Sequence, residues 1–144
     1  MRSCFAPLAG CATTGPLKPV TRVARPPEKP LLIFDGDCAF CRRWIARWKQ
    51  TTGERVDYAP LQSDDIAARF PELPREQLEF AVHLILPDGR VARAAEAVFR
   101  SLAVARRWPL WLYENVPGFA SLTEVAYRIV AANRGFFSRV TRWL

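Results

Sequence analysis

One short stretch constrains the fold of this chain more than any other: an apolar run, a tight turn and a helix that opens with two cysteines. Residues 31–34 are four apolar residues in succession, which predicts a short buried β-strand. Asp-Gly-Asp at 35–37 ends this strand, because Gly and Asp both favour tight turns. Apolar side chains then recur at helical spacing, which predicts a helix over residues 38–51. The sequence therefore predicts that Cys38 and Cys41 lie on the first turn of a helix that follows a strand.

This placement favours thiol chemistry. Two sulfurs three residues apart on a helix share a face and lie close enough to form a disulfide. Cys38 falls where unpaired N–H groups and the helix dipole favour an anion, so we predict it as the exposed nucleophile and Cys41 as the resolving thiol. Asp35 either relays a proton during exchange or only bonds back to the chain within the turn. Asp37 is expected to cap the helix.

The composition is that of one globular domain. The chain has 144 residues, of which 50% are hydrophobic and 24% charged, and this allows a sizeable core. No stretch is long and apolar enough to predict a membrane span, and we expect a cytoplasmic protein. Four cysteines are too few for a disulfide scaffold in a chain of this size, which favours a redox or metal role for the close pair.

The net charge of +7 is unevenly distributed. Residues 1–29 hold five Lys/Arg and one acid, and residues 100–144 hold seven Arg and two acids. Such charge permits contact with nucleic acid or with an anionic membrane. Because no nucleic-acid-binding motif accompanies it, we expect no nucleic-acid partner. The aromatic residues of 108–113 have two possible roles: they cover the sheet, or they make peripheral contact with a membrane.

Residues 1–30 predict a disordered or flexible leader, because six prolines interrupt them and no apolar periodicity survives. Leu8-Ala9-Gly10-Cys11 resembles a lipoprotein cleavage box, but the apolar region before it is shorter than a signal peptide requires. A basic, acid-poor leader also allows an organelle transit peptide. Despite both alternatives, we expect a cytoplasmic protein whose N-terminal residues form an unstructured extension.

The order of elements predicts an α/β fold. Strands are predicted at 31–34, 55–60, 81–86 and 90–93, helices at 38–51, 63–70, 95–106, 121–134 and 136–143, a turn at 75–78 and an aromatic segment at 110–113. The first crossover implies two parallel strands and the hairpin adds two antiparallel ones. This predicts a thioredoxin-like or glutaredoxin-like three-layer core with a mixed four-stranded sheet over residues 31–107. Residues 108–144 would form a C-terminal helical extension packed on the same domain.

Residues 34–41 resemble the signature of the DCC family, which comprises thiol-disulfide oxidoreductases of thioredoxin-like fold. The family takes its name from an Asp-x-x-Cys-x-x-Cys motif, which falls here on Asp35, Cys38 and Cys41. Further similar blocks follow in the same order at 87–89, 95–97 and 127–134, so that the resemblance extends from about residue 31 to residue 137. It implies redox chemistry at the two cysteines.

Two departures accompany this resemblance. Family members often have Gly where this chain has Ala94. Thioredoxins and glutaredoxins also place a cis-proline before the third strand, where this chain has Phe80-Ala81, and a cis peptide is not expected there without proline. Either recognition of the substrate backbone is therefore expected to differ from that of thioredoxin, or the protein acts on something other than polypeptide disulfides.

Three other interpretations of the same residues remain open. A zinc site at Cys38 and Cys41 would need two more ligands, and neither the leader cysteines nor His83, which we interpret as structural, has matching spacing. An apolar run followed by Asp35 and Asp37 resembles the first motif of haloacid-dehalogenase-type phosphatases, although no lysine follows Lys49. A non-catalytic thioredoxin-like binding module is the third alternative.

The sequence therefore predicts a thiol-disulfide oxidoreductase. Cys38 would attack, Cys41 would resolve the mixed disulfide, and Asp35 would relay a proton. The expected partner is a disulfide-bearing protein or small molecule. No bound cofactor or metal is expected, only an external thiol reductant such as glutathione or a thioredoxin system.

Overall fold

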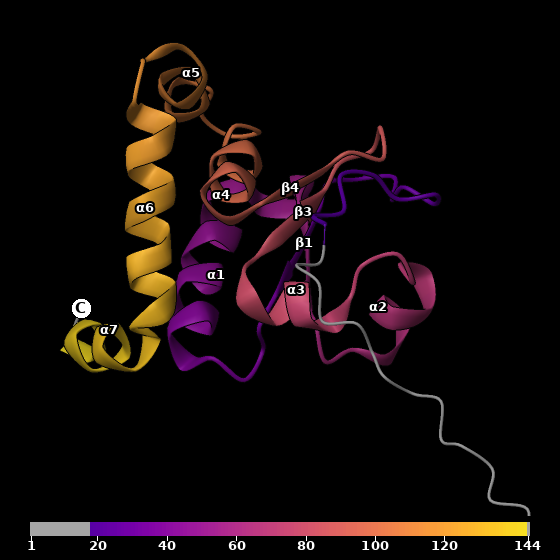
Figure 1. Ribbon diagram of the computed structural model, residues 1–144, viewed down its shortest axis with the longest axis horizontal. Helices are drawn as coiled ribbons and strands as arrows, with labels where there is room; N and C mark the ends of the chain where they lie inside the picture. Colours follow the sequence, from indigo (N-terminus) through magenta and orange to yellow (C-terminus); the bar gives the residue numbers. More distant parts are fainter. Residues whose placement is uncertain (1–17, 144) are drawn as a thin grey trace, which may run out of the picture.

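A mixed four-stranded sheet forms the centre of the molecule in the computed structural model, which describes residues 18–143 (Figure 1). The strand order is β2-β1-β3-β4. The strands are β1 (Leu31–Phe34), β2 (Asp57–Pro60), β3 (His83–Ile85) and β4 (Val91–Arg93). β1 pairs in parallel with β2, whereas β3 is antiparallel to both β1 and β4. The predicted parallel pair and the predicted hairpin are both confirmed.

Helices cover both faces of this sheet. Across the described residues they are α1 (Ala39–Thr52), α2 (Asp64–Arg69), α3 (Arg75–Phe80), α4 (Ala94–Leu102), α5 (Trp108–Asn115), α6 (Phe119–Ala132) and α7 (Arg134–Val140). Short 3₁₀ turns follow at Gly53–Arg55 and Thr141–Trp143. In Figure 1, α2 and α3 lie on one side of the sheet and α1 and α4 on the other, with α6 outside them. The predicted α/β, thioredoxin-like fold is confirmed.

β1 is buried along its whole length because it lies inside the sheet and helices cover both of its faces. Successive side chains of a strand point to opposite faces. Leu31 and Ile33 accordingly join the apolar cluster under α2 and α3, and Leu32 and Phe34 join the cluster under α1 and α4. The carboxyl end of β1, where the turn and the cysteines follow, is therefore anchored from both sides.

Several helix boundaries differ from the sequence-based prediction. The predicted turn at 75–78 is the helix α3, and the aromatic segment at 110–113 belongs to the helix α5, which has a proline in its first turn. α6 begins at Phe119 after Gly118, whose φ is +81°. The predicted cap, Ser121, lies inside this helix instead, because the left-handed Gly118 turns the chain three residues earlier.

The prediction of a loosely attached segment up to residue 30 is wrong for the part that the structure describes. Val91 N–H donates to the carbonyl of Thr21, and Val23 N–H donates to the carbonyl of Gly89, both at 2.9 Å. Val23 is also buried in the core. A short apolar stretch between prolines is enough to line the β3–β4 hairpin. Cys4, Cys11 and the cleavage-box resemblance lie outside the described residues.

Candidate active site

The two cysteines lie where the sequence predicts, at the first turn of α1 directly after β1. Cys38 is the N-cap residue of α1, with an extended backbone (φ −78°, ψ 109°). Its Sγ accepts the backbone N–H of Cys41 at 3.2 Å. Cys38 therefore caps the helix with sulfur, and the prediction that Asp37 is the cap is wrong. Both thiols are free and partly buried.

Cys41 is held in its protonated form. Burial is the largest cause and raises the pKa of the Cys41 thiol to about 12, and the hydrogen bond and negative charge of Cys38 and the charge of Asp35 act in the same direction. The guanidinium of Arg134 opposes them and lowers this pKa. At neutral pH Cys41 consequently keeps its proton.

The turn before the cysteines is tied together by a glutamine from another part of the chain. Asp35 Oδ1 accepts the backbone N–H of Asp37 at 3.0 Å, which is the turn role predicted for Asp35. Gln62 donates from Nε2 to Asp35 Oδ1 at 2.9 Å and to Asp37 Oδ2 at 3.1 Å. Its Oε1 accepts the backbone N–H of Gly36 at 3.0 Å. No local pattern identified Gln62, which follows β2 and reaches the site only through the pairing of β2 with β1.

Gly36 is required by space, not by a special backbone angle. Its φ is not among the positive values of the described glycines. A Cβ atom built at this position would lie 2.8 Å from Cβ of Pro60 and 2.9 Å from Oε1 of Gln62. Only glycine therefore lets the turn approach the end of β2 this closely. The sequence-based reason for Gly36, the backbone angles of a tight turn, is not the one that the structure shows.

Arg134, at the start of α7, joins the C-terminal helices to this site. Its Nη1 lies 3.5 Å from Oδ2 of Asp35, and its Nη2 donates to the carbonyl of Phe80 at 3.0 Å. Both charged side chains of the pair are mostly buried, at 23% and 24% exposed. In the sequence Arg134 stands within a block of family resemblance, and no local pattern gives it a role.

The loop before β3 is held by side chains in the place where thioredoxins use a cis-proline. The described residues contain no cis peptide bond, in agreement with the prediction for Phe80-Ala81. The Val82 N–H donates to the hydroxyl of Tyr127 at 3.0 Å, so that α6 as well as α7 fixes this loop. Burial raises the pKa of Tyr127, and the nearby Cys41 adds to this effect.

Two cavities lie in this part of the molecule, and Tyr127 lines both of them. One has a volume of about 340 Å³, is almost entirely apolar and includes Cys41 in its wall. The rest of its lining comes from α1, α4, α6 and Val82, including Phe40, Trp44, Trp48, Val98, Phe99 and Val130. An apolar side chain or ring bound there would lie beside the Cys41 thiol.

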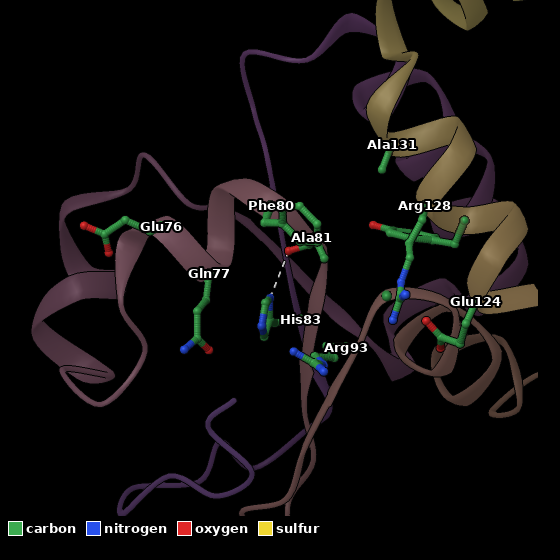
Figure 2. A pocket seen from close by; sticks show the side chains of 11 residues that line it. Glu76, Gln77, Phe80, Ala81, His83, Arg93, Glu124, Arg128 and Ala131 are labelled. Carbon is green, nitrogen blue, oxygen red and sulfur yellow. Dashed lines mark hydrogen bonds between the residues drawn. The ribbon is translucent and has the colours of Figure 1, made fainter. Parts of the chain in front are cut away.

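The second cavity, of about 480 Å³, lies between α3, β3, β4 and α6 (Figure 2). Its wall is largely apolar, and it also carries the carboxylates of Glu76 and Glu124. Arg93 and Arg128 both line it, and neither guanidinium has an ion-pair or hydrogen-bond partner among residues 18–143. His83 is buried at the bottom, and its Nδ1 lies 2.9 Å from the carbonyl of Ala81. Burial lowers the pKa of His83, so the imidazole is neutral at pH 7. The structural role predicted for His83 agrees with this bond.

The structure also bears on a metal site, a membrane span and the pair of aspartates. Among residues 18–143 there is no group of three or more His, Cys, Asp and Glu side chains that could hold a metal ion. Within the same residues no helix has the length and hydropathy needed to cross a bilayer. The carboxylates of Asp35 and Asp37 share the amide of Gln62.

Comparison with known proteins connects this geometry to one family. No curated protein and no solved structure matches the chain. The family model described as DCC1-like thiol-disulfide oxidoreductase matches residues 32–140, a span that holds Asp35, both cysteines, Tyr127 and Arg134. Because this match covers well over half of the 144 residues and contains the whole of the site built above, the chain belongs to the DCC1-like thiol-disulfide oxidoreductase family.

Proposed function

We propose that this protein catalyses thiol-disulfide exchange through Cys38 and Cys41. The observation that carries the proposal is the asymmetry of the pair: Cys38 Sγ accepts an N–H at the start of α1, while Cys41 keeps its proton. A sulfur in the position of Cys38 is the one on which negative charge is best accommodated. The thiolate of Cys38 attacks a substrate disulfide and forms a mixed disulfide, and the substrate's other sulfur leaves as a thiolate that takes a proton from water.

The second step requires Cys41 to lose its proton. As the sulfur of Cys41 attacks Cys38, the Cys38–Cys41 disulfide forms, the mixed disulfide breaks and the remaining substrate sulfur leaves as a thiolate. We assign Asp35 as the acceptor of the Cys41 proton, because its carboxylate acts on Cys41 electrostatically and Arg134 and Gln62 fix its position. Arg134 is then a positioning residue for Asp35.

The substrate of the forward reaction is a disulfide in a protein or small molecule, and an external thiol restores the dithiol. Two molecules of a monothiol such as glutathione reduce the Cys38–Cys41 disulfide and leave as one disulfide molecule, so that electrons and protons balance. Glu76 and Glu124 line the same cavity as Arg93 and Arg128, but Glu124 already accepts the Tyr113 hydroxyl and the Glu96 N–H. The guanidiniums of Arg93 and Arg128, which have no partner among residues 18–143, therefore support a reductant with carboxylates. A dithiol of the thioredoxin type is the alternative reductant. In a reducing compartment such as the cytoplasm, this cycle would run as a reductase.

Trapping tests the exchange reaction. In the Cys41→Ser variant the mixed disulfide on Cys38 has no resolving thiol, so we expect it to accumulate with a model disulfide and to appear as an adduct by non-reducing mass spectrometry. The Cys38→Ser variant is the control and should form no such adduct at residue 41. If Cys38→Ser binds partners unchanged and neither variant accumulates an adduct, the protein is a binding module and the proposal is wrong.

Thiols of different charge test the reductant. We expect glutathione to reduce the oxidised protein faster than cysteamine, which is cationic, once the rates are corrected for thiol pKa. In the double variant Arg93→Gln/Arg128→Gln this preference should disappear while the rate with 2-mercaptoethanol, which is neutral, is unchanged. Equal effects on all three thiols would show that the arginines do not select the reductant.

A further inference from the structure

The surface of the C-terminal helices is unusually apolar. Nine large apolar side chains are exposed in the described part of the chain, and eight of them lie between residues 108 and 140. Seven of these form what we name the apolar strip, each 50–66% exposed: Trp108, Trp111, Leu122, Val125, Ile129, Phe136 and Val140. Exposed apolar residues scattered singly need no explanation, but a concentration of this kind indicates an interaction surface. The expectation that these aromatics cover the sheet is wrong for Trp108 and Trp111.

The strip follows from the helical positions of its residues. Leu122, Val125 and Ile129 recur at i, i+3 and i+7 and therefore share one face of α6. The opposite face carries Tyr127, which points inward and bonds the Val82 amide. α6 is thus apolar on its outer face as well as its inner one.

α7 repeats this arrangement. Phe136 and Val140 share its outer face at i and i+4, whereas Arg134 and Phe137 face inward, against Asp35 and Phe40 respectively. Figure 1 shows α6 and α7 at the edge of the molecule, outside α1 and α4 and away from α2 and α3. The exposed faces therefore belong to consecutive helices at one side of the protein.

The charges around the strip are positive and unpaired. The only acids of residues 108–143, Glu114 and Glu124, are both engaged: Glu114 lies 3.2 Å from Arg100, and Glu124 accepts the Tyr113 hydroxyl at 3.0 Å. By contrast, Arg128, Arg139 and Arg142 have no ion-pair or hydrogen-bond partner within the described residues. At about 100° per residue, Arg139 lies roughly a quarter turn from the centre of the apolar face of α7, whereas Arg128 points into the cavity beside Arg93 (Figure 2). Cations thus flank the apolar strip.

We propose that this strip binds the surface of an anionic lipid membrane. Exposed tryptophans and aliphatic side chains would enter the interfacial layer, and the flanking arginines would reach the lipid phosphates. Charge favours this occupant over a second copy of the chain, because two strips facing each other would bring arginines against arginines. The protein would attach to one surface of the bilayer, and this binding does not depend on the proposed redox activity.

Vesicle sedimentation with the full chain tests the proposal. We expect binding to vesicles of phosphatidylglycerol and phosphatidylcholine, little binding to phosphatidylcholine alone, and weaker binding at 0.5 M NaCl. Two arginines at an anionic surface contribute enough that Arg139→Gln/Arg142→Gln should lower the partition coefficient roughly 30-fold. Leu122→Ser/Ile129→Ser should also lower it, with the fold checked by circular dichroism.

A charge-matched control separates the strip from net charge. Arg69→Gln/Arg75→Gln removes the same charge from α2 and α3, far from the strip, and should change binding less than 3-fold. Equal loss in both double variants, or equal binding to neutral and anionic vesicles, would overturn the proposal. A dimer detected by light scattering would also overturn the proposal if Leu122→Ser/Ile129→Ser converts it to monomer and anionic vesicles do not. A second copy of the chain would then cover the strip.

Discussion

The guanidinium of Arg134 lies 3.5 Å from the carboxylate of Asp35, although 99 residues separate them in the sequence. The same guanidinium donates to the carbonyl of Phe80, in the loop before β3. One side chain therefore ties α7 to the end of β1 and to the loop that lies beside the cysteines. The C-terminal helices are in this sense part of the candidate active site, not an addition to it.

Removing this contact should weaken both the fold and the site. We expect Arg134→Gln to lower the free energy of unfolding by about 1.5–3 kcal/mol, because a mostly buried carboxylate loses its charged hydrogen-bond donor. The pKa of Cys41 should rise further, since Arg134 is the group that lowers it. Denaturant unfolding of Arg134→Gln, Asp35→Asn and the double variant gives the coupling energy. Arg128→Gln is the exposed control, and a coupling energy near zero would show that the pair contributes nothing.

The two cysteines should differ in their reactivity with pH. Because burial raises the pKa of Cys41 to about 12, this thiol should remain almost unlabelled by iodoacetamide at pH 8, while Cys38 is alkylated. Peptide mass spectrometry on the reduced protein distinguishes the two sites. Labelling of Cys41 at the rate of Cys38 would contradict the asymmetry on which the proposed mechanism rests.

The same raised pKa predicts how stability depends on pH. In the unfolded chain Cys41 ionises near its ordinary value of 9.0, whereas in the folded protein it keeps its proton up to about 12. The unfolded state therefore loses the proton first, and stability should fall as pH rises from 9 towards 12. The Cys41→Ala variant lacks this contribution to the pH dependence of the free energy of unfolding. The difference between the two proteins therefore separates the contribution of Cys41 from that of the tyrosines.

Two glycines should respond in opposite directions to the same substitution. Gly36→Ala should destabilise the protein by about 1–3 kcal/mol, because its Cβ would overlap Pro60 and the amide of Gln62. Gly135→Ala, in α7, meets nothing within 4 Å and should stabilise by about 0.5–1 kcal/mol through helix propensity. Thermal unfolding of both variants measures the contrast. A neutral Gly36→Ala would mean that the turn can move away from β2.

Ala94 is the position where family members often have glycine, and its φ is +53°. Ala94→Gly should relieve about 1–2 kcal/mol of backbone strain. Lost methyl contacts and the greater entropy of glycine in the unfolded chain offset this gain, so we expect the free energy of unfolding to change by no more than about 1 kcal/mol. Ala94→Val should cost more than about 2 kcal/mol, because a β-branched residue resists this backbone conformation. Urea unfolding distinguishes these outcomes, and similar stabilities of the two variants would contradict the assigned conformation.

Some of the fold is local enough to be predicted from the chain. β1, its turn and α1 follow from four apolar residues, Asp-Gly-Asp and helical periodicity within one continuous stretch. The hairpin at Pro87-Asp88-Gly89 is equally local, and Gly89 adopts the positive φ of +84° that such a turn requires. Predictions failed where two local patterns competed: Gly118 starts α6 before Ser121, and Cys38 caps α1 in place of Asp37.

By itself the sequence determined that two cysteines would stand at the start of a helix after a buried strand, because periodicity and turn chemistry act over a few residues. Only the tertiary structure decided what surrounds them. Gln62 and Arg134 reach the site through strand pairing and helix packing, and Gly36 matters because β2 lies against it. The protonated state of Cys41 depends first on burial, which arises when α4 and α7 pack against α1. Contacts between distant segments of the chain leave no periodic trace in its sequence.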